Sequence, residues 1–384
     1  MVNAMKKTFR KLFCLVLIVA MLFTSVCCIA YGKEKDLVYV SLGDSIADGI
    51  GLPENPLSGT DQPNKDLVYC NKTAGAYPVL IAEQLGIKDK DFYQLGCAGM
   101  RTVELRYCLD PTYRIPNKNT FNFQEDELEK YVLGRFNYQK LVKKADIITL
   151  NMCANDIAAY TMVTLESTLA SYGVSEKTIN NLTCEALKRG EYFGALCELL
   201  NYASKLNGYS HIASVTIKAL NDGYNTWTKN WDAICKIIYK LNPDVQLVCL
   251  GLYNPFSEMK LTDDSLFGIG SALDSIILAV DSWCISGSKY SDKYTYVSIF
   301  GIESLFEAKN MTFTDENFFD NLTLYAHPSL KGHKQIADRV VKQIEAAKYI
   351  PAPVTTFMSV SKSIIKTVSN YAAKIVTKMF SIFK

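Results

Sequence analysis

Two residue types that together perform acyl transfer stand far apart in this sequence, a serine near its start and a histidine near its end. Ser45 follows Gly43-Asp44 where an apolar, β-branched segment ends, and His327 precedes a proline shortly before an amphipathic pattern. A serine hydroxyl is a weak nucleophile until a base takes its proton, and imidazole is well suited to that exchange near neutral pH. The two residues therefore indicate a nucleophile and its general base. Taken alone, Ser45 equally fits an ordinary helix N-cap.

Two further residues offer hydrogen-bond donors to the negative charge that such a reaction develops. Gly99 lets a backbone N–H approach closely, and Asn155 carries a side-chain amide. One donor of this kind is typically worth about 3 kcal/mol in the transition state. In isolation, Gly99 also fits a loop glycine and Asn155 a helix cap. Asp156, the next residue, is expected to have a structural role.

A second histidine, His333, lies close to the first in the sequence. Pro328 fixes the chain after His327, so this imidazole can be presented rigidly from a loop, accept the serine proton and return it to the leaving group. His333 falls inside the last helical pattern, where packing or a structural hydrogen bond is the more natural role. His327 is therefore the predicted base.

A sheet of parallel strands would bring these distant residues to one edge. Short apolar segments alternate with helical patterns, which predicts βαβ units, a sheet covered on both faces and a three-layer α/β/α sandwich. Ligand sites in such sheets lie at the carboxyl ends of the strands. The predicted strands are Leu37–Leu42, Phe92–Leu95, Ile147–Asn151, Val245–Leu250 and Tyr294–Ile299, and the helical patterns are Ala76–Leu85, Tyr138–Lys144, a series from Ile157 to Leu241, and Gly332–Ala347.

Residues 161–230 are more than one crossover needs, so they are predicted as a helical insertion within a catalytic domain of residues 33–350. The insertion is expected either to roof the site or to add structural padding. The Pro/Gly/Asn-rich stretch from Ile50 to Thr73, beside Ser45, is long enough to shape a substrate entrance.

The two ends of the chain differ in composition from its middle. Residues 1–32 carry a basic start and the apolar run Leu12–Phe23, which predicts a secretory signal, with an uncleaved membrane anchor as the alternative. Residues 351–384 form a basic, amphipathic helical pattern without acidic residues. This tail is expected to bind an anionic membrane or cell-wall surface, or else to dock on the protein itself.

Charge and cysteine content narrow the function further. The whole chain has a formal net charge of +2, and both ends are basic, so the part between them is acidic and binding of nucleic acid is not expected. Three histidines and the lack of Cys-x-x-Cys spacing make a zinc site improbable. Nine of the twelve cysteines lie beyond residue 32, an odd number that would leave at least one thiol unpaired after export.

The blocks around Ser45, Gly99, Asn155 and His327 resemble those of the SGNH, or GDSL, hydrolase superfamily over about Leu37 to Ala346. The resemblance implies a flavodoxin-like sandwich with five parallel strands in the order 2-1-3-4-5. It also implies that Ser45 is the nucleophile and His327 the base. The backbone N–H groups of Ser45 and Gly99, with the Asn155 side chain, would form the oxyanion hole.

The sequence departs from the usual family pattern at two places. Cys153-Ala154 stand where two glycines are usual, and Leu324 stands where an aspartate usually orients the histidine. One branch, which resembles extracellular actinobacterial esterases, uses a backbone carbonyl there instead. The resemblance to that branch implies that the Leu324 carbonyl holds the Nδ1–H of His327. Asp320 or Asn321 are the alternatives.

The same branch pairs cysteines near the oxyanion loop. In this sequence Cys70 precedes Tyr77-Pro78, and Cys97 precedes Ala98-Gly99. The resemblance therefore implies a disulfide between Cys70 and Cys97, and a second one between Cys184 and Cys197 in the insertion.

The function that follows is a secreted serine ester hydrolase, of esterase or lipase type, that works through an acyl-enzyme. No metal and no organic cofactor is expected. The substrate would be a small-molecule, lipid or acetylated polysaccharide ester. The alternative is a catalytically weakened protein that binds a cell surface or membrane, since the orienting aspartate is missing.

Overall fold

The computed structural model describes residues 36–55, 72–115, 135–188, 199, 202–203, 206, 209–256, 267–310 and 322–349. The predicted signal and tail, and residues 56–71 of the entrance loop, lie outside these ranges. Within them, five parallel strands form one sheet in the order β2-β1-β3-β4-β5, which confirms the predicted topology. The strands are β1 (Tyr39–Gly43), β2 (Phe92–Gly96), β3 (Ile147–Asn151), β4 (Gln246–Leu250) and β5 (Thr295–Val297).

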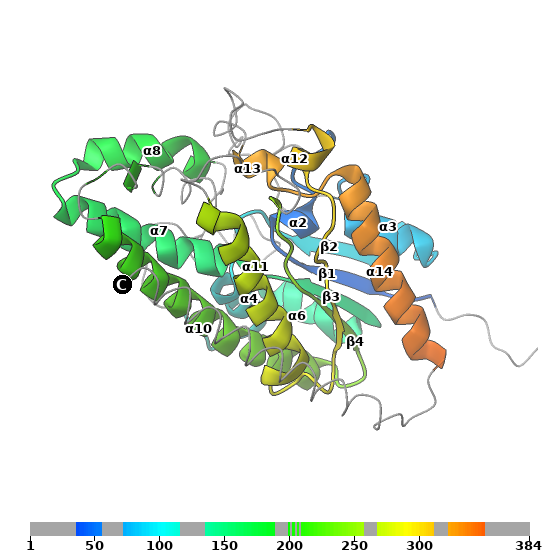
Figure 1. Ribbon diagram of the computed structural model, residues 1–384. Helices are drawn as coiled ribbons and strands as arrows, with labels where there is room; N and C mark the ends of the chain where they lie inside the picture. The colour runs from blue at the N-terminus through cyan, green and yellow to red at the C-terminus, as the bar shows by residue number, and fades with distance from the viewer. Residues whose placement is uncertain are drawn as a thin grey trace, which may run out of the picture. The chain divides into compact units, whose positions relative to one another are not determined.

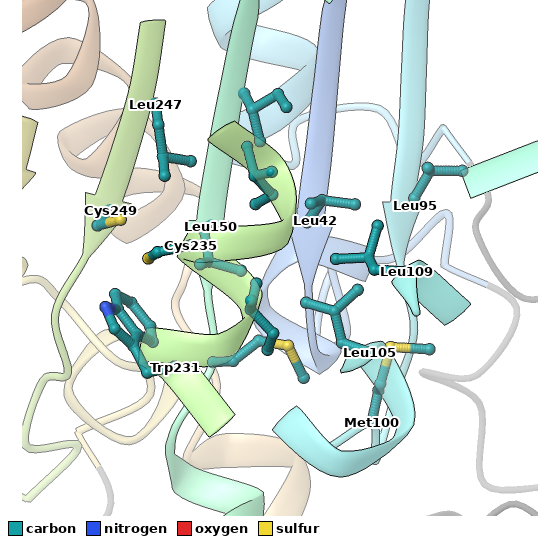
Figure 2. Close-up of a cluster of buried hydrophobic side chains, with 14 of the residues drawn as sticks. Leu42, Leu95, Met100, Leu105, Leu109, Leu150, Trp231, Cys235, Leu247 and Cys249 are labelled. Carbon is teal, nitrogen blue, oxygen red and sulfur yellow. The ribbon is translucent and has the colours of Figure 1, made fainter. Parts of the chain in front are cut away.

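In the described ranges, four helices cover one face of the sheet. Side chains alternate along each strand, so every second residue points to these helices. Leu42, Leu95 and Leu150 come from three neighbouring strands and join one buried cluster with Leu105 and Trp231 from two of these helices (Figure 2). The helices are α4 (Thr102–Leu109), α6 (Arg135–Lys144), α10 (Tyr209–Leu241) and α11 (Phe267–Ser282).

The opposite face is covered by α3 (Tyr77–Gln84) and α14 (Leu330–Tyr349), which lie together on the other side of the sheet (Figure 1). This face buries polar side chains as well as apolar ones. The Tyr39 hydroxyl and the Thr149 hydroxyl are 2.8 Å apart, so the two polar groups satisfy each other across β1 and β3. Helices on both faces make the predicted three-layer sandwich.

The described part of the predicted insertion is helical, and its last helix continues into the layer that packs on the sheet. Helices α7 (Ala154–Ser171) and α8 (Glu176–Lys188) pack into a small cluster that includes Met162 and Ile179. The expected boundary at residue 230 falls inside α10, whose Trp227 and Trp231 are buried in the cluster against the sheet. Helix α10 is a single continuous helix at the end of the series that is predicted from Ile157 to Leu241.

Three four-residue helices complete the edge of the sheet where the site lies. They are α2 (Ser45–Asp48), α12 (Leu305–Ala308) and α13 (Leu322–Tyr325). None of the helices in the described ranges combines the length and the apolarity that a bilayer crossing requires.

Candidate active site

The site lies where three strands end at the same level. Gly43, the last residue of β1, is in register with Gly96 of β2 and with Asn151 of β3. The three loops that leave these positions therefore start side by side at one edge of the sheet. They lead to Ser45 at the start of α2, to Gly99, and to Asn155 at the start of α7.

Ser45 and His327 are in direct contact. The Oγ of Ser45 lies 2.8 Å from the Nε2 of His327, a hydrogen-bond distance. Ser45 is the first residue of α2, and the side chain of Asp44 caps this helix by accepting the Ile46 N–H at 3.1 Å. His327 comes from the loop between α13 and α14 and is only 8% exposed. Residues from opposite ends of the sequence thus meet in the contact that is predicted for a nucleophile and its base.

The loop after β2 is a tight turn that presents Gly99. The Met100 N–H donates to the Cys97 carbonyl at 3.1 Å, and Gly99 has a φ of 75°, as the third residue of a type II turn requires. The Cys97 N–H donates in turn to the Gly43 carbonyl at 3.1 Å, which ties the turn to the strand before the serine. Gly99 is therefore held beside the start of α2.

Asn155 is joined to the same turn. Its Nδ2 donates to the Met100 carbonyl at 3.2 Å, and the residue is 9% exposed. In the described part of the chain, the backbone N–H groups of Ser45 and Gly99 donate no hydrogen bond. These two N–H groups and the second Asn155 amide hydrogen are therefore available to a ligand at this edge.

Asp156 braces the end of the turn rather than facing the serine. Its carboxylate accepts the Thr102 N–H at 3.0 Å and the Thr102 hydroxyl at 2.5 Å. Beside it, Arg101 and Glu104 form an ion pair at 2.6 Å with almost no exposed side-chain surface. Sequence reasoning missed these three neighbours, because nothing in their local pattern marks them as part of a site.

Two buried carboxyl groups belong to residues that adjoin the candidate residues in the sequence, Asp44 before Ser45 and Asp156 after Asn155. Burial raises the pKa of Asp44 to about 7, and the nearby charge of Asp156 acts in the same direction. Burial likewise raises the pKa of Asp156 to about 7, against the lowering effect of its bonds to Thr102. Partial protonation near neutral pH reduces the negative charge that would otherwise oppose an oxyanion.

The loop that carries His327 is held by a second set of residues that the sequence did not single out. Glu303 accepts the Ser329 hydroxyl at 2.6 Å and the Lys331 ammonium at 2.7 Å, and these bonds hold the pKa of Glu303 below its usual value. The Ser329 N–H donates to the Glu303 carbonyl at 3.0 Å, and Ser304 pairs with Pro328 in an antiparallel bridge. The part of the loop that follows His327 is thereby fixed.

The orientation of the imidazole through Leu324 stays a prediction. The Leu324 carbonyl accepts the backbone N–H of His327 at 3.2 Å, so it lies next to the histidine. A bond from the ring Nδ1–H to this carbonyl is the predicted addition. The alternatives Asp320 and Asn321 lie outside the described residues.

His333 occupies a different place from His327. It is fully buried in α14, and its Nδ1 accepts the Tyr77 N–H at 3.2 Å, so it caps the start of α3. Burial lowers the pKa of His333 to about 3. It is therefore a neutral structural residue at ordinary pH.

The predicted disulfides cannot be matched to described partners. Cys97 is buried beside the turn, but Cys70 lies outside the described residues, as do Cys197 and the side chain of Cys184. Both pairings stay predictions. In the described ranges, no cluster of His, Cys, Asp and Glu side chains has an arrangement that could hold a metal ion.

Comparison with known proteins identifies the family. The model of the GDSL-like lipase/acylhydrolase family matches residues 39–340, which is most of the chain. A comparison with curated proteins gives no match.

Similar solved structures include an extracellular lipase from Streptomyces rimosus, with 16% identity, 81% of this chain and 99% of that chain covered, and a TM-score of 0.41. A phospholipase A1 from Streptomyces albidoflavus has 15% identity, the same two coverages and a TM-score of 0.39. A family two carbohydrate esterase from Clostridium thermocellum has 12% identity, coverage of 82% and 66%, and a TM-score of 0.36. The family match alone carries the assignment: this chain belongs to the GDSL-like lipase/acylhydrolase family and is a carboxylic ester hydrolase.

Proposed function

We propose that this protein is an exported serine ester hydrolase that acts through an acyl-enzyme formed on Ser45. The observation that supports the proposal most directly is the 2.8 Å contact between Ser45 Oγ and His327 Nε2 at the carboxyl edge of the sheet. A hydroxyl in hydrogen-bond contact with an imidazole nitrogen is the arrangement that activates serine for attack.

Each step uses groups at this edge. The Ser45 oxygen attacks the ester carbonyl carbon while His327 Nε2 takes its proton. The resulting oxyanion accepts hydrogen bonds from the N–H groups of Ser45 and Gly99 and from the Asn155 amide. The C–O bond to the alcohol then breaks, and His327 returns the proton to the departing alcohol. A water molecule activated by His327 attacks the acyl-enzyme, the acid leaves, and Ser45 regains its proton.

The substrate class we propose is a carboxylic ester of a lipid or of an acetylated carbohydrate. Export rests on the basic and apolar composition of residues 1–32. The basic amphipathic pattern of residues 351–384 supports contact with an anionic membrane or wall surface, where such esters occur.

Replacement of the nucleophile tests the proposal. Ser45→Ala should lower the hydrolysis of p-nitrophenyl esters by at least about a thousandfold, because no covalent route remains. Ser41→Ala is the matched control, since it makes the same change in the buried strand β1, four residues before Ser45. Its activity should stay near that of the wild type.

Labelling by a fluorophosphonate probe gives an independent readout. Mass spectrometry should locate the label on Ser45 in the wild type and in Ser41→Ala, and find none in Ser45→Ala. Undiminished hydrolysis in Ser45→Ala would refute the assignment of the nucleophile. A folded wild type without hydrolysis or label would favour a weakened, surface-binding protein.

A further inference from the structure

The orientation of His327 depends strongly on its backbone. The peptide group before His327 is held on its N–H side, which donates to the Leu324 carbonyl at 3.2 Å. The peptide group after it is held on its carbonyl side, which accepts the Leu305 N–H at 2.9 Å. Because the two peptide planes that flank His327 are fixed, the direction of its Cα–Cβ bond is fixed too. The imidazole therefore leaves the loop in a set direction.

One side chain completes this arrangement from a distant element. The Tyr253 hydroxyl donates a hydrogen bond to the Ala326 carbonyl. That carbonyl belongs to the same peptide group as the His327 N–H, so this group is held at both of its polar ends. Tyr253 reaches it from the loop after β4, 73 residues earlier in the sequence. The tyrosine thus links the central sheet to the loop of the base.

The surroundings of Tyr253 keep its hydroxyl a donor. The residue is 8% exposed, and burial raises its pKa well above the usual value. The nearby charges of Asp44 and Glu307 raise the pKa further. Asp44 caps the helix of Ser45, so the charge that acts on Tyr253 belongs to a neighbour of the proposed nucleophile. A protonated phenol is present there over the whole pH range in which an ester hydrolase works.

The same loop makes a second contact with the elements around His327. The Ser304 hydroxyl donates to the Pro255 carbonyl at 2.9 Å, and Ser304 pairs with Pro328, the residue after the histidine. The loop after β4 therefore supports the histidine loop on both sides of His327. Leu324, three residues before His327, has no carboxylate that could help to hold the histidine.

We infer that Tyr253 is a positioning residue of the hydrolase, which holds the peptide group before His327 so that Nε2 meets Ser45 Oγ. This inference rests on the proposed function of Ser45 and His327. Removing the hydroxyl leaves the Ala326 carbonyl without its donor and allows the peptide group to rotate. The imidazole then spends less time in contact with the serine. Since the Tyr253 hydroxyl is already used by the Ala326 carbonyl, substrate binding should change little while turnover falls.

The experiment compares two tyrosines that make the same kind of bond. Tyr253→Phe removes the hydroxyl that serves the histidine loop. Tyr294→Phe is the matched control, because the buried Tyr294 hydroxyl also donates to a backbone carbonyl, that of Cys284, at 2.5 Å. Both variants keep the ring, and both should lower the thermal unfolding temperature to a similar, small extent.

Steady-state kinetics on a p-nitrophenyl ester give the decisive readout. Tyr253→Phe should lower kcat roughly tenfold, with KM within about twofold of the wild type, because a small displacement of a catalytic group costs rate rather than binding. The rate of labelling by a fluorophosphonate should fall in parallel. Tyr294→Phe should match the wild type in both measurements.

The failure of this inference differs from the failure of the proposed function. If Ser45→Ala abolishes hydrolysis but Tyr253→Phe keeps the wild-type kcat, the positioning role is wrong and the nucleophile stands. If Tyr253→Phe and Tyr294→Phe lose activity equally, the loss is one of general stability, and the positioning role is again wrong. If the folded wild type shows no Ser45-dependent hydrolysis, both proposals fall together.

Discussion

Asn155 carries two amide hydrogens, and the fold uses one of them. Its Nδ2 donates to the Met100 carbonyl, which fixes the side chain beside the turn of Gly99. An amide held in this way needs no reorganisation when an oxyanion forms, and such preorganised donors contribute strongly to acyl transfer. The same side chain therefore serves the turn and the proposed transition state.

Removing this amide should affect turnover more than stability. Asn155→Ala is expected to lower kcat by about 10²–10³-fold with little change in KM, the usual effect of losing one oxyanion donor. Asn242→Ala is the control, because Asn242 also donates to backbone carbonyls, at 2.9 Å and 2.7 Å, at the far end of α10. This control should lose stability and keep kcat. Equal kcat values for Asn155→Ala and the wild type would exclude the oxyanion role.

At the scale of elements, helix α2 has to sit directly on the strand ends to present Ser45. A Cβ added at Gly96 would lie 2.8 Å from the carbonyl carbon of Ala47 and 2.8 Å from the nitrogen of Asp48, both backbone atoms of α2. The side chain of Gln94 holds the same helix by donating to the Ala47 carbonyl. The position of the serine is thus set by close packing between α2 and β2.

A methyl group at Gly96 should displace this helix. Gly96→Ala is expected to lower the free energy of unfolding by about 1–3 kcal/mol through overpacking. It should also lower kcat by at least about tenfold, because α2 carries the proposed nucleophile. Gly86→Ala is the comparison, since a Cβ there meets nothing within 4 Å and suffers only from a φ of 64°. The Gly86→Ala variant should lose about 1–2 kcal/mol of unfolding free energy and keep its activity. Urea unfolding and ester hydrolysis measure the two effects. Full activity in a folded Gly96→Ala would show that α2 tolerates the shift.

At the scale of the whole molecule, His333 joins the two helices that cover one face of the sheet. It lies in α14 and accepts the N–H of Tyr77 at the start of α3. Burial depresses its folded-state pKa from 6.5 to about 3, so the native state favours the neutral ring. The stability that it contributes is fully present above pH 6.5 and is lost as the pH falls towards 3.

This linkage can be isolated with a neutral substitute. His333→Asn keeps an acceptor for the Tyr77 N–H but cannot titrate. Between pH 7 and pH 5, the free energy of unfolding of the wild type should fall by about 2 kcal/mol relative to that of the variant, since each pH unit below the unfolded pKa costs about 1.4 kcal/mol. Asp44 and Asp156 titrate in both proteins, so their effects cancel in this difference. Urea unfolding curves at several pH values give the measurement, and parallel pH dependences would contradict it.

Much of the fold could be predicted because the signals that specify it are local. A predicted strand such as Ile147–Asn151 matches β3 residue for residue, since a run of β-branched and apolar side chains fits a strand buried on both faces. The order of the strands came from family resemblance, and the parallel pairings β2-β1-β3-β4-β5 confirm it. The continuous helix α10 was harder to predict. Gly223 in its middle is a poor helix former, but a Cβ there would lie 2.9 Å from the Cα of Ile157, so close packing against α7 explains it.

The sequence by itself predicted which residues carry the chemistry, and it determined that Ser45, Gly99 and Asn155 follow strand ends, because each block is a short motif in a recognisable local setting. Only the tertiary structure decided how those residues are held. Tyr253 meets Ala326, Gln94 meets Ala47, and Thr102 meets Asp156 across long stretches of sequence. A side-chain hydrogen bond of this kind depends on which elements pack together and on the distance between them. The hydrophobic periodicity of a single segment determines neither the packing partner nor the distance.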